Sequence, residues 1–485
     1  MPRCLLFLLL FLLLACPTAG DGDANGDDDD ATADDDDATG DDDDATGDDD
    51  DATGDDDDSA PLGAGDFTVQ VPSTSAGPEG LAVRVFHPAE SDARYPGAAP
   101  VTLSVSGGLG MNALTEEGES PDGVPQGMLV VEFLFPGVSR PGGTSGGTYD
   151  FRGPDCRQAL ADVVRYAAGE LADTDGDTLL DRVPFADPDN LGVVGRSNGG
   201  NLVLAALAEH AANLPDVHWF VAWESPVGDQ FVTTELNDNP HYTPGTCAAT
   251  TCPTPGLADA LAWDPSGSTS FNDAFNQSQS VAGAICVDAD ASGTCEEGEK
   301  RFGGGPTETA PGLFRIHPSS ELAAAIAARG PALFDGPAPP WLATEPQTTE
   351  YWDGRDGALA VPALHAAWPA LGVIHVQTAD DHVQSQPDHP HAAAHLQAWI
   401  DAGHGFARLN ADAVYIAEAS GIDAAQIPEL DANQPVPWPA IGDAVLAETI
   451  AGTPTAPFVT GAAMAELADR TRAGEWSVDL DVVLD

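Results

Sequence analysis

A glycine-rich turn around one serine constrains the fold of this chain more than any other feature. The run Gly195-Arg196-Ser197-Asn198-Gly199-Gly200 follows an apolar stretch, residues 191–194, and precedes a helix-forming segment, residues 201–210. A Gly-x-Ser-x-Gly sequence between a buried strand and a helix predicts a sharp, strained turn, because glycines leave the chain room to fold back. The strain lifts the serine hydroxyl clear of the backbone, and the positive end of the following helix points at it.

The turn assigns Ser197 a chemical role as well as a place. Its hydroxyl is expected to attack a carbonyl carbon, which would make the chain a serine hydrolase. The alternative is coincidence, because Gly-x-Ser-x-Gly is a weak pattern by itself in a chain with 52 glycines. The strand before the turn and the helix after it are the context that favours the first interpretation.

The first 15 residues predict an export signal. Arg3 supplies one positive charge, and residues 5–15 are an apolar run too short to span a bilayer comfortably. The run ends in Leu13-Leu14-Ala15-Cys16, which resembles a bacterial lipobox. The resemblance implies that Cys16 is the mature N-terminus and carries lipid, which would anchor the protein to a membrane of the bacterial cell envelope. The alternative is an ordinary secretory signal peptide in which Cys16 is incidental.

Residues 16–65 are expected to form an acidic, disordered tether. Runs of four aspartates repeat with a period of seven, and no apolar residue occupies a coiled-coil core position. Like charges repel, so the segment should be extended and act as a spacer or, alternatively, as a loose sponge for divalent cations. Outside the tether and the signal segment, 57 acidic residues still outnumber 16 basic ones. Such a surface repels nucleic acid and anionic membranes, which leaves the lipid as the expected membrane contact.

Cysteine usage indicates an oxidising compartment. Two pairs lie close in sequence, Cys247 with Cys252 and Cys286 with Cys295. Local disulfides are the simplest expectation for an exported protein. Zinc is the alternative, although neither pair has the two-residue spacing of a zinc knuckle. Cys156 is left over and is expected to be buried on a helix.

The body of the chain predicts one α/β domain with an insertion. Alternating or apolar runs predict strands at residues 67–71, 81–86, 101–105, 128–134, 191–194, 218–223 and 371–378. Strands come first and strand–helix alternation follows, which is the α/β-hydrolase pattern. We expect residues 66–224 to form the first part of the core, and residues 361–485 to form its second part with a C-terminal region.

The residues of the turn resemble the α/β-hydrolase superfamily. The double glycine after Ser197 is most similar to the turn of prolyl-oligopeptidase-type hydrolases, and the resemblance covers roughly residues 80–225 and 360–410. It implies a mostly parallel central sheet flanked by helices, with residues 225–360 inserted as a cap that shapes the substrate pocket. The alternative for this insertion is a passive surface excursion, which its length disfavours.

The resemblance also implies partners for Ser197. Hydrolases of this class carry an orienting acid at the end of the seventh strand, where Asp380 stands; an ordinary acidic loop is the alternative. Two histidines remain open as the base. His404 is favoured by its Gly-His-Gly-Phe sequence, whereas His391 is favoured by topology, because it follows the seventh strand at the correct edge of the sheet. If neither is the base, the serine is inactive or differently activated.

The oxyanion hole is expected to use backbone amides. The first donor is the N–H of Asn198, the residue after the nucleophile. The second comes from the loop after the third strand, where Gly107 and Gly108 permit close approach of the backbone. The esterase-type His-Gly-Gly sequence is absent from that loop.

Two acidic loops predict structural calcium. Residues 288–299 match a calcium-loop template of alternating oxygen ligands, a central glycine and a final glutamate. Their candidate ligands are Asp288, Asp290, Ser292, Thr294, Glu296 and Glu299. Residues 173–181 resemble the loops of thrombospondin-type calcium repeats, with candidate ligands Asp173, Asp175, Asp177 and Asp181. A solvated turn is the alternative for each loop, and no cofactor is expected for catalysis.

Two functions therefore remain from the sequence. The leading one is a lipid-anchored, exported serine hydrolase acting on a small ester or peptide substrate. The alternative is a catalytically inactive hydrolase-fold domain that serves as a calcium-stabilised surface binding protein. The feature that discriminates between them is a histidine within reach of Ser197.

Overall fold

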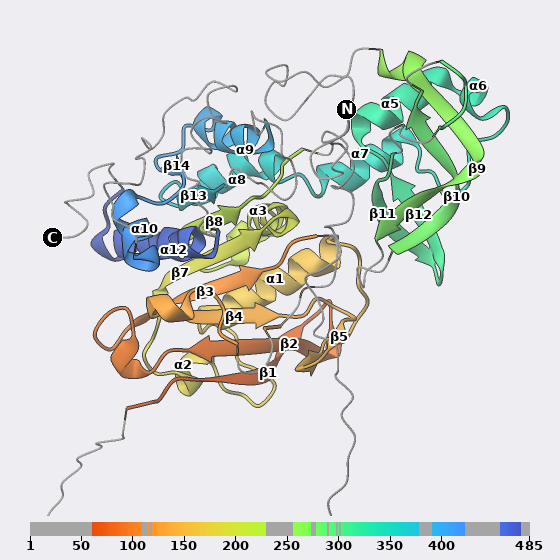
Figure 1. Cartoon of the computed structure of the whole chain (residues 1–485). Coiled ribbons are helices and arrows are strands. Elements are labelled where there is room, and N and C mark those ends of the chain that lie inside the picture. Colours follow the sequence, from red (N-terminus) through yellow and green to blue (C-terminus); the bar gives the residue numbers. More distant parts are fainter. Residues whose placement is uncertain are drawn as a thin grey trace, which may run out of the picture. The chain divides into compact units, whose positions relative to one another are not determined.

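An eight-stranded sheet is the centre of this computed structural model (Figure 1). The structure describes residues 61–108, 112, 114–115, 119–228, 256–272, 278–288, 291–296, 299, 302–377, 390–421 and 456–476. The strands are β1 (Gly65–Ser73), β2 (Gly77–His87), β3 (Ala99–Val105), β4 (Leu129–Phe133), β7 (Ala186–Arg196), β8 (Trp219–Trp223), β13 (Gly372–Val376) and β14 (Ala407–Leu409). The predicted strands of the core are thereby confirmed.

The strand order defines the fold. It runs β1-β2-β4-β3-β7-β8-β13-β14, and β2 is antiparallel to both of its neighbours. From β4 to β14 all neighbours are parallel. This is the order of the α/β-hydrolase fold. Its parallel strands are buried on both faces, which explains their nearly continuous apolar sequences.

Helices cover both faces of the sheet. One core cluster joins the strands to α1 (Pro154–Ala167), α3 (Asn198–His210), α8 (Gly357–Ala367) and α9 (Pro390–Asp401). A second cluster joins them to α10 (Ala413–Ser420) and α12 (Ala456–Ala473). The neighbouring residues Val373 and Ile374 of β13 belong to different clusters, because successive side chains of a strand point to opposite faces. None of the described helices is long and apolar enough to cross a bilayer.

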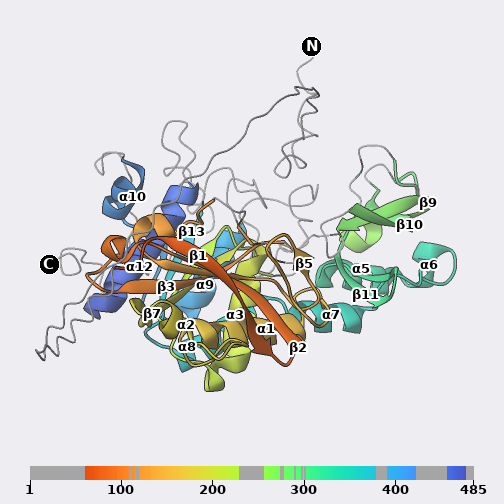
Figure 2. The ribbon, with the colours of Figure 1, turned by 90° about the horizontal axis from the view of Figure 1, so that it is seen from below.

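The segment between β8 and β13 builds a core of its own. Its elements are two hairpins, β9 (Leu261–Asn272) with β10 (Ser278–Val287) and β11 (Gly305–Ala310) with β12 (Leu313–His317), and the helices α5 (Ser320–Arg329), α6 (Pro331–Phe334) and α7 (Glu345–Asp353). Figure 2 shows these hairpins and helices gathered together. Leu261, Ile285 and Ile326 meet in a separate apolar cluster. The predicted disulfide Cys286–Cys295 is present, whereas Cys247 and Cys252 lie outside the described residues.

Candidate active site

Ser197 stands at the sharp turn that the sequence predicts. It follows β7 and caps α3, with φ 50° and ψ −132°. A positive φ is rare outside glycine and costs about 1–3 kcal/mol, so the surrounding structure must hold it in place. The N–H of Ser197 donates to the carbonyl of Trp223 at 2.7 Å, which ties the turn to the end of β8.

The glycines around Ser197 are required by close packing. A Cβ on Gly195 would lie 2.5 Å from the Cα of Gly200, and a Cβ on Gly200 would overlap the side chain of Ser225. The hydroxyl of Ser225 donates to the carbonyl of Gly195 at 3.1 Å. The turn is thus wedged between α3 and the chain that leaves β8, and no larger residue fits at these two glycines.

The predicted oxyanion residues meet at Ser197. A Cβ on Gly107 would lie 2.6 Å from the Cβ of Ser197, so the loop after β3 lies directly against Ser197. Asn198 is the first residue of α3, and its side-chain amide donates to the carbonyl of Gly108 at 3.1 Å. The structure therefore brings Asn198, Gly107 and Gly108 together beside Ser197.

His404 lies at the wrong edge of the sheet. Its Nε2–H donates to the carbonyl of Leu371, which precedes β13, and its Nδ1 lies 3.2 Å from that of His365. Because Ala407 pairs with Val373, residue 404 is at the amino end of the parallel strands. Ser197 follows the carboxyl end of β7. The prediction of His404 as the base is therefore corrected: the Gly-His-Gly-Phe sequence is a buried helix-to-strand turn.

His391 lies in the first turn of α9 and is fully buried. One turn later, the Nδ1–H of His395 points to the carbonyl of Ser225 at 3.4 Å. Since Ser225 packs against Gly195 and Gly200, α9 contacts the turn at residues 195–200, the elbow, on the face that carries both histidines. Asp380, the predicted acid, lies outside the described residues.

His375 and His395 form a buried pair beside this face. Their ring centroids are 4.1 Å apart in an edge-on arrangement. Burial lowers the pKa of His395 to about 3 and holds the pKa of His375 well below its ordinary value. Both imidazoles are therefore neutral near pH 7, so they add no positive charge to the site.

Two polar residues at the carboxyl edge of the sheet were not predicted from the sequence. Glu224 follows β8, is buried and has φ 42°, and its N–H donates to the carbonyl of Val376 at 2.8 Å. Asn410 follows β14 with φ 59°, and its side-chain carbonyl accepts the N–H of Gln377 at 2.8 Å. The end of the eighth strand thus carries an asparagine. A polar residue directly after an apolar strand is the signal that could have indicated both.

The acidic loop at residues 173–181 is closed around an arginine. Arg182 contacts the carboxylates of Asp173 at 2.6 Å, Asp177 at 3.2 Å and Asp175 at 3.3 Å. The carboxylate of Asp181 instead accepts the N–H of Thr178 at the start of the helix α2 (Leu179–Arg182). The oxygen donors suit calcium, but here a guanidinium supplies the positive charge.

In the second acidic loop, residues 288–299, carboxylates accept hydrogen bonds from the backbone of the loop itself. Asp288 accepts the N–H groups of Ser292 at 2.9 Å and Gly293 at 2.7 Å, and Glu299 accepts that of Glu296 at 2.9 Å. Asp290 lies outside the described residues. Within the described part of the chain, no group of three acidic, histidine or cysteine side chains is arranged to hold a metal ion.

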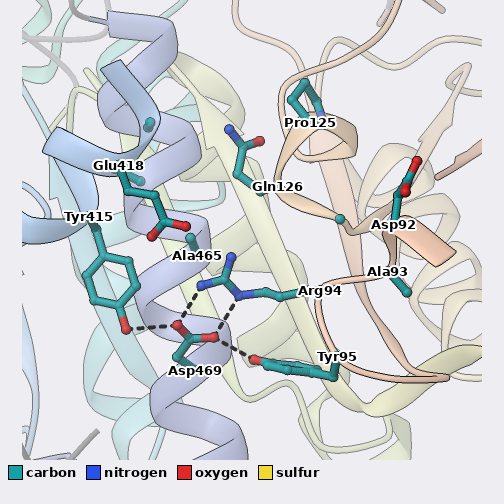
Figure 3. Close-up of a pocket in the computed structure, with 13 residues that line it drawn as sticks. Asp92, Ala93, Arg94, Tyr95, Pro125, Gln126, Tyr415, Glu418, Ala465 and Asp469 are labelled. Carbon is teal, nitrogen blue, oxygen red and sulfur yellow. Dashed lines mark hydrogen bonds and ion pairs between the residues drawn. The ribbon is translucent and has the colours of Figure 1, made fainter. Parts of the chain in front are cut away.

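A cavity of about 670 Å³ lies away from Ser197, between the β2–β3 connection, α10 and α12 (Figure 3). Asp469 is its central group and accepts both Nε and Nη2 of Arg94, at 2.6 and 2.5 Å. The hydroxyls of Tyr95 and Tyr415 donate to the same carboxylate at 2.8 and 2.9 Å. These bonds fasten α12 to the β2–β3 connection and to α10, and none of the predicted catalytic residues lines the cavity.

No protein-family model and no curated protein sequence matches this chain. Among solved structures it is similar to a brefeldin A esterase, a bacterial homologue of human hormone-sensitive lipase, with 17% identity over 35% of this chain and 42% of that one, and a TM-score of 0.25. A bacterial heroin esterase gives 21% identity over 37% and 50%, with a TM-score of 0.25. A prolyl endopeptidase gives 19% over 35% and 22%, with a TM-score of 0.24. The chain thus spans half or less of the length of these structures. The assignment of the fold therefore rests on the strand order of the sheet.

Proposed function

We propose that this chain is a serine hydrolase that cleaves ester or peptide bonds through an acyl-enzyme on Ser197. The observation that carries the proposal is the left-handed backbone of Ser197 at a strand-to-helix turn, with Gly107 packed against it. Strain of this kind collects where a side chain has to be presented for chemistry. The elbow of the α/β-hydrolase fold presents a nucleophile in this way.

The reaction would proceed in two steps. The Ser197 hydroxyl adds to the substrate carbonyl as the base takes its proton. The N–H groups of Asn198 and of the loop at Gly107 and Gly108 bind the developing oxyanion. The base then protonates the departing alcohol or amine, which leaves an acyl group on Ser197. Water, activated by the same base, releases the acid and regenerates the serine.

His391 is the proposed base. Its helix contacts the elbow through Ser225, and it is at the edge of the sheet where Ser197 stands. Asp380 is kept as the orienting acid, and Glu224 is a second candidate for that role because it is buried at the end of the neighbouring strand β8.

Hydrolysis assays test the proposal directly. p-Nitrophenyl acetate and a peptide p-nitroanilide are offered to the wild type and to Ser197→Ala. We expect the wild type to cleave one of these substrates and Ser197→Ala to be slower by about a thousandfold or more. Ser91→Ala, which changes an exposed serine far along the chain, should match the wild type. Equal rates for Ser197→Ala and the wild type would overturn the proposal.

A catalytically inactive binding protein is the second candidate function. It is favoured by Asn410, which stands after β14, the position where the family places its histidine. The last histidine in the sequence is His404, so none follows that strand. A folded wild-type chain that cleaves neither substrate would favour this second function.

We also propose that the protein is exported, lipid-anchored at Cys16 and stabilised by calcium. The lipobox-like sequence supports the first two, and the oxygen-rich sequence of residues 288–299 supports the third. Thermal melting with calcium and with a chelator tests the metal. A chelator should lower the melting temperature, whereas an unchanged value would argue against structural calcium.

A further inference from the structure

Arg152 is buried against the loop that lies beside Ser197. Only 2% of its surface is exposed, and its guanidinium lies 4.5 Å from the ring centroid of Phe135. Its Nη2 donates to two successive carbonyls of the loop after β3, that of Ser106 at 2.9 Å and that of Gly107 at 3.0 Å. A charged donor shared by two carbonyls in a buried site is a strong restraint on the backbone.

These two bonds fix the orientation of two peptide planes. In a trans peptide the carbonyl and the following N–H point in opposite directions. With the carbonyls of Ser106 and Gly107 drawn to Arg152, the N–H groups of Gly107 and Gly108 face away from it. Two glycines give the loop little preference of its own, so the guanidinium decides which way its amides face.

Arg355 supports this arrangement from the segment between β8 and β13. Its Nε donates to the carbonyl of Phe151 at 2.9 Å, and its Nη2 to that of Asp150 at 3.2 Å. Its guanidinium also lies 3.8 Å from the ring centroid of Tyr351 on α7. Phe151 and Arg152 both have a left-handed backbone, with φ 56° and 66°, a strained conformation for residues other than glycine. The bonds from Arg355 hold that strained pair in place.

We propose that Arg152 is a positioning residue that sets the amides of residues 107 and 108 for the oxyanion, and that Arg355 links this loop to the inserted segment. The inference rests on the proposed hydrolase function. In this role Arg152 does not contact the substrate itself, because it acts through the backbone beside Ser197. Loss of Arg152 should therefore lower kcat and leave KM nearly unchanged.

The test compares Arg152→Ala, Arg152→Lys and Arg355→Gln with the wild type. Arg152→Ala should lower kcat for p-nitrophenyl acetate by about 10- to 100-fold, with KM within about twofold, because oxyanion donors contribute on that scale. Arg152→Lys, which keeps the charge, should recover part of the loss, and Arg355→Gln should show a smaller loss. Arg157→Lys is the matched control, because Arg157 binds the carbonyl of Gly354 at 2.9 Å but does not touch the loop. A wild-type kcat in folded Arg152→Ala or Arg152→Lys would overturn the inference.

Amide hydrogen exchange separates this inference from the hydrolase proposal. The peptide covering residues 101–115 should exchange faster in Arg152→Ala and Arg152→Lys than in the wild type or Arg157→Lys. If the wild type cleaves no substrate, the hydrolase proposal fails, and the exchange result alone decides whether Arg152 holds the loop. Unchanged exchange in both Arg152 variants would overturn that role.

Discussion

Ser197 keeps a costly backbone conformation because glycines pack around the turn and a hydrogen bond holds its N–H. Gly107 and Gly195 remove the side chains that would collide with the turn, and the carbonyl of Trp223 accepts the N–H of Ser197. At the scale of single residues, the strain at Ser197 is therefore stabilised from three strands. The helix α9, which carries His391, contacts this turn through Ser225, whereas His404 lies at the opposite edge of the sheet.

Exchanging the two candidate histidines for glutamine should separate their roles. His391→Gln should abolish hydrolysis, with a loss in kcat of about a thousandfold, because the base is removed. His404→Gln should retain kcat, because His404 contacts Leu371 at the amino edge of the sheet. Both rates are measured on the substrate that the wild type cleaves. Full activity in His391→Gln would contradict the assignment of the base.

The buried imidazole of His395 predicts sensitivity to acid. Its pKa is near 3 in the folded chain, against about 6.5 when unfolded, so the unfolded state binds the additional proton between these values. Folding stability is therefore fully present above about pH 6.5 and falls as the pH drops toward 3, by up to about 1.4 kcal/mol per pH unit for such a histidine.

His395→Phe should weaken this dependence, because phenylalanine keeps the ring and cannot be protonated. Urea unfolding measured from pH 7 to pH 4 should give a shallower decline for this variant than for the wild type. His365→Phe makes the same change at a half-buried position and should leave the slope closer to that of the wild type. Identical slopes for His395→Phe and the wild type would contradict the buried, neutral state of His395.

At the scale of elements, the proposed active site depends on how closely the loop after β3 meets the turn between β7 and α3. Gly107→Ala places a methyl group 2.6 Å from the Cβ of Ser197 and 3.0 Å from the carbonyl oxygen of Arg196. We expect a loss of about 1–3 kcal/mol in the free energy of unfolding and a large loss of hydrolysis. Gly63→Ala is the control, because its Cβ would meet open space. Equal stability and activity in the two variants would disprove the close approach.

The sequence predicted these elements well because their signals are local. The apolar runs of β3, β4, β8 and β13 and the glycines around Ser197 are each contained in a few residues. The edge at which His404 lies depends instead on the pairing of β14 with β13, and nothing local encodes that pairing. Arg152 was missed for the same reason, since its contacts to residues 106 and 107 cross a long stretch of chain.

At the scale of the whole molecule, the sheet order and the separate core between β8 and β13 describe a hydrolase fold with a large insertion. The proposed export and lipid attachment concern residues that precede this part of the chain. Cys16→Ser tests them: in a bacterial host, the wild type should fractionate with membranes and the variant should be released into the soluble fraction. Membrane association of Cys16→Ser equal to the wild type would contradict a lipid on Cys16.

Covalent labelling of Ser197 tests the central claim most directly. The folded wild-type chain is treated with a fluorophosphonate probe, and the adduct is located by peptide mass spectrometry. Our account predicts one adduct, on Ser197, and none in Ser197→Ala. A folded, calcium-loaded wild-type chain that takes up no probe, or that carries it on another residue, would contradict an active nucleophile at this turn.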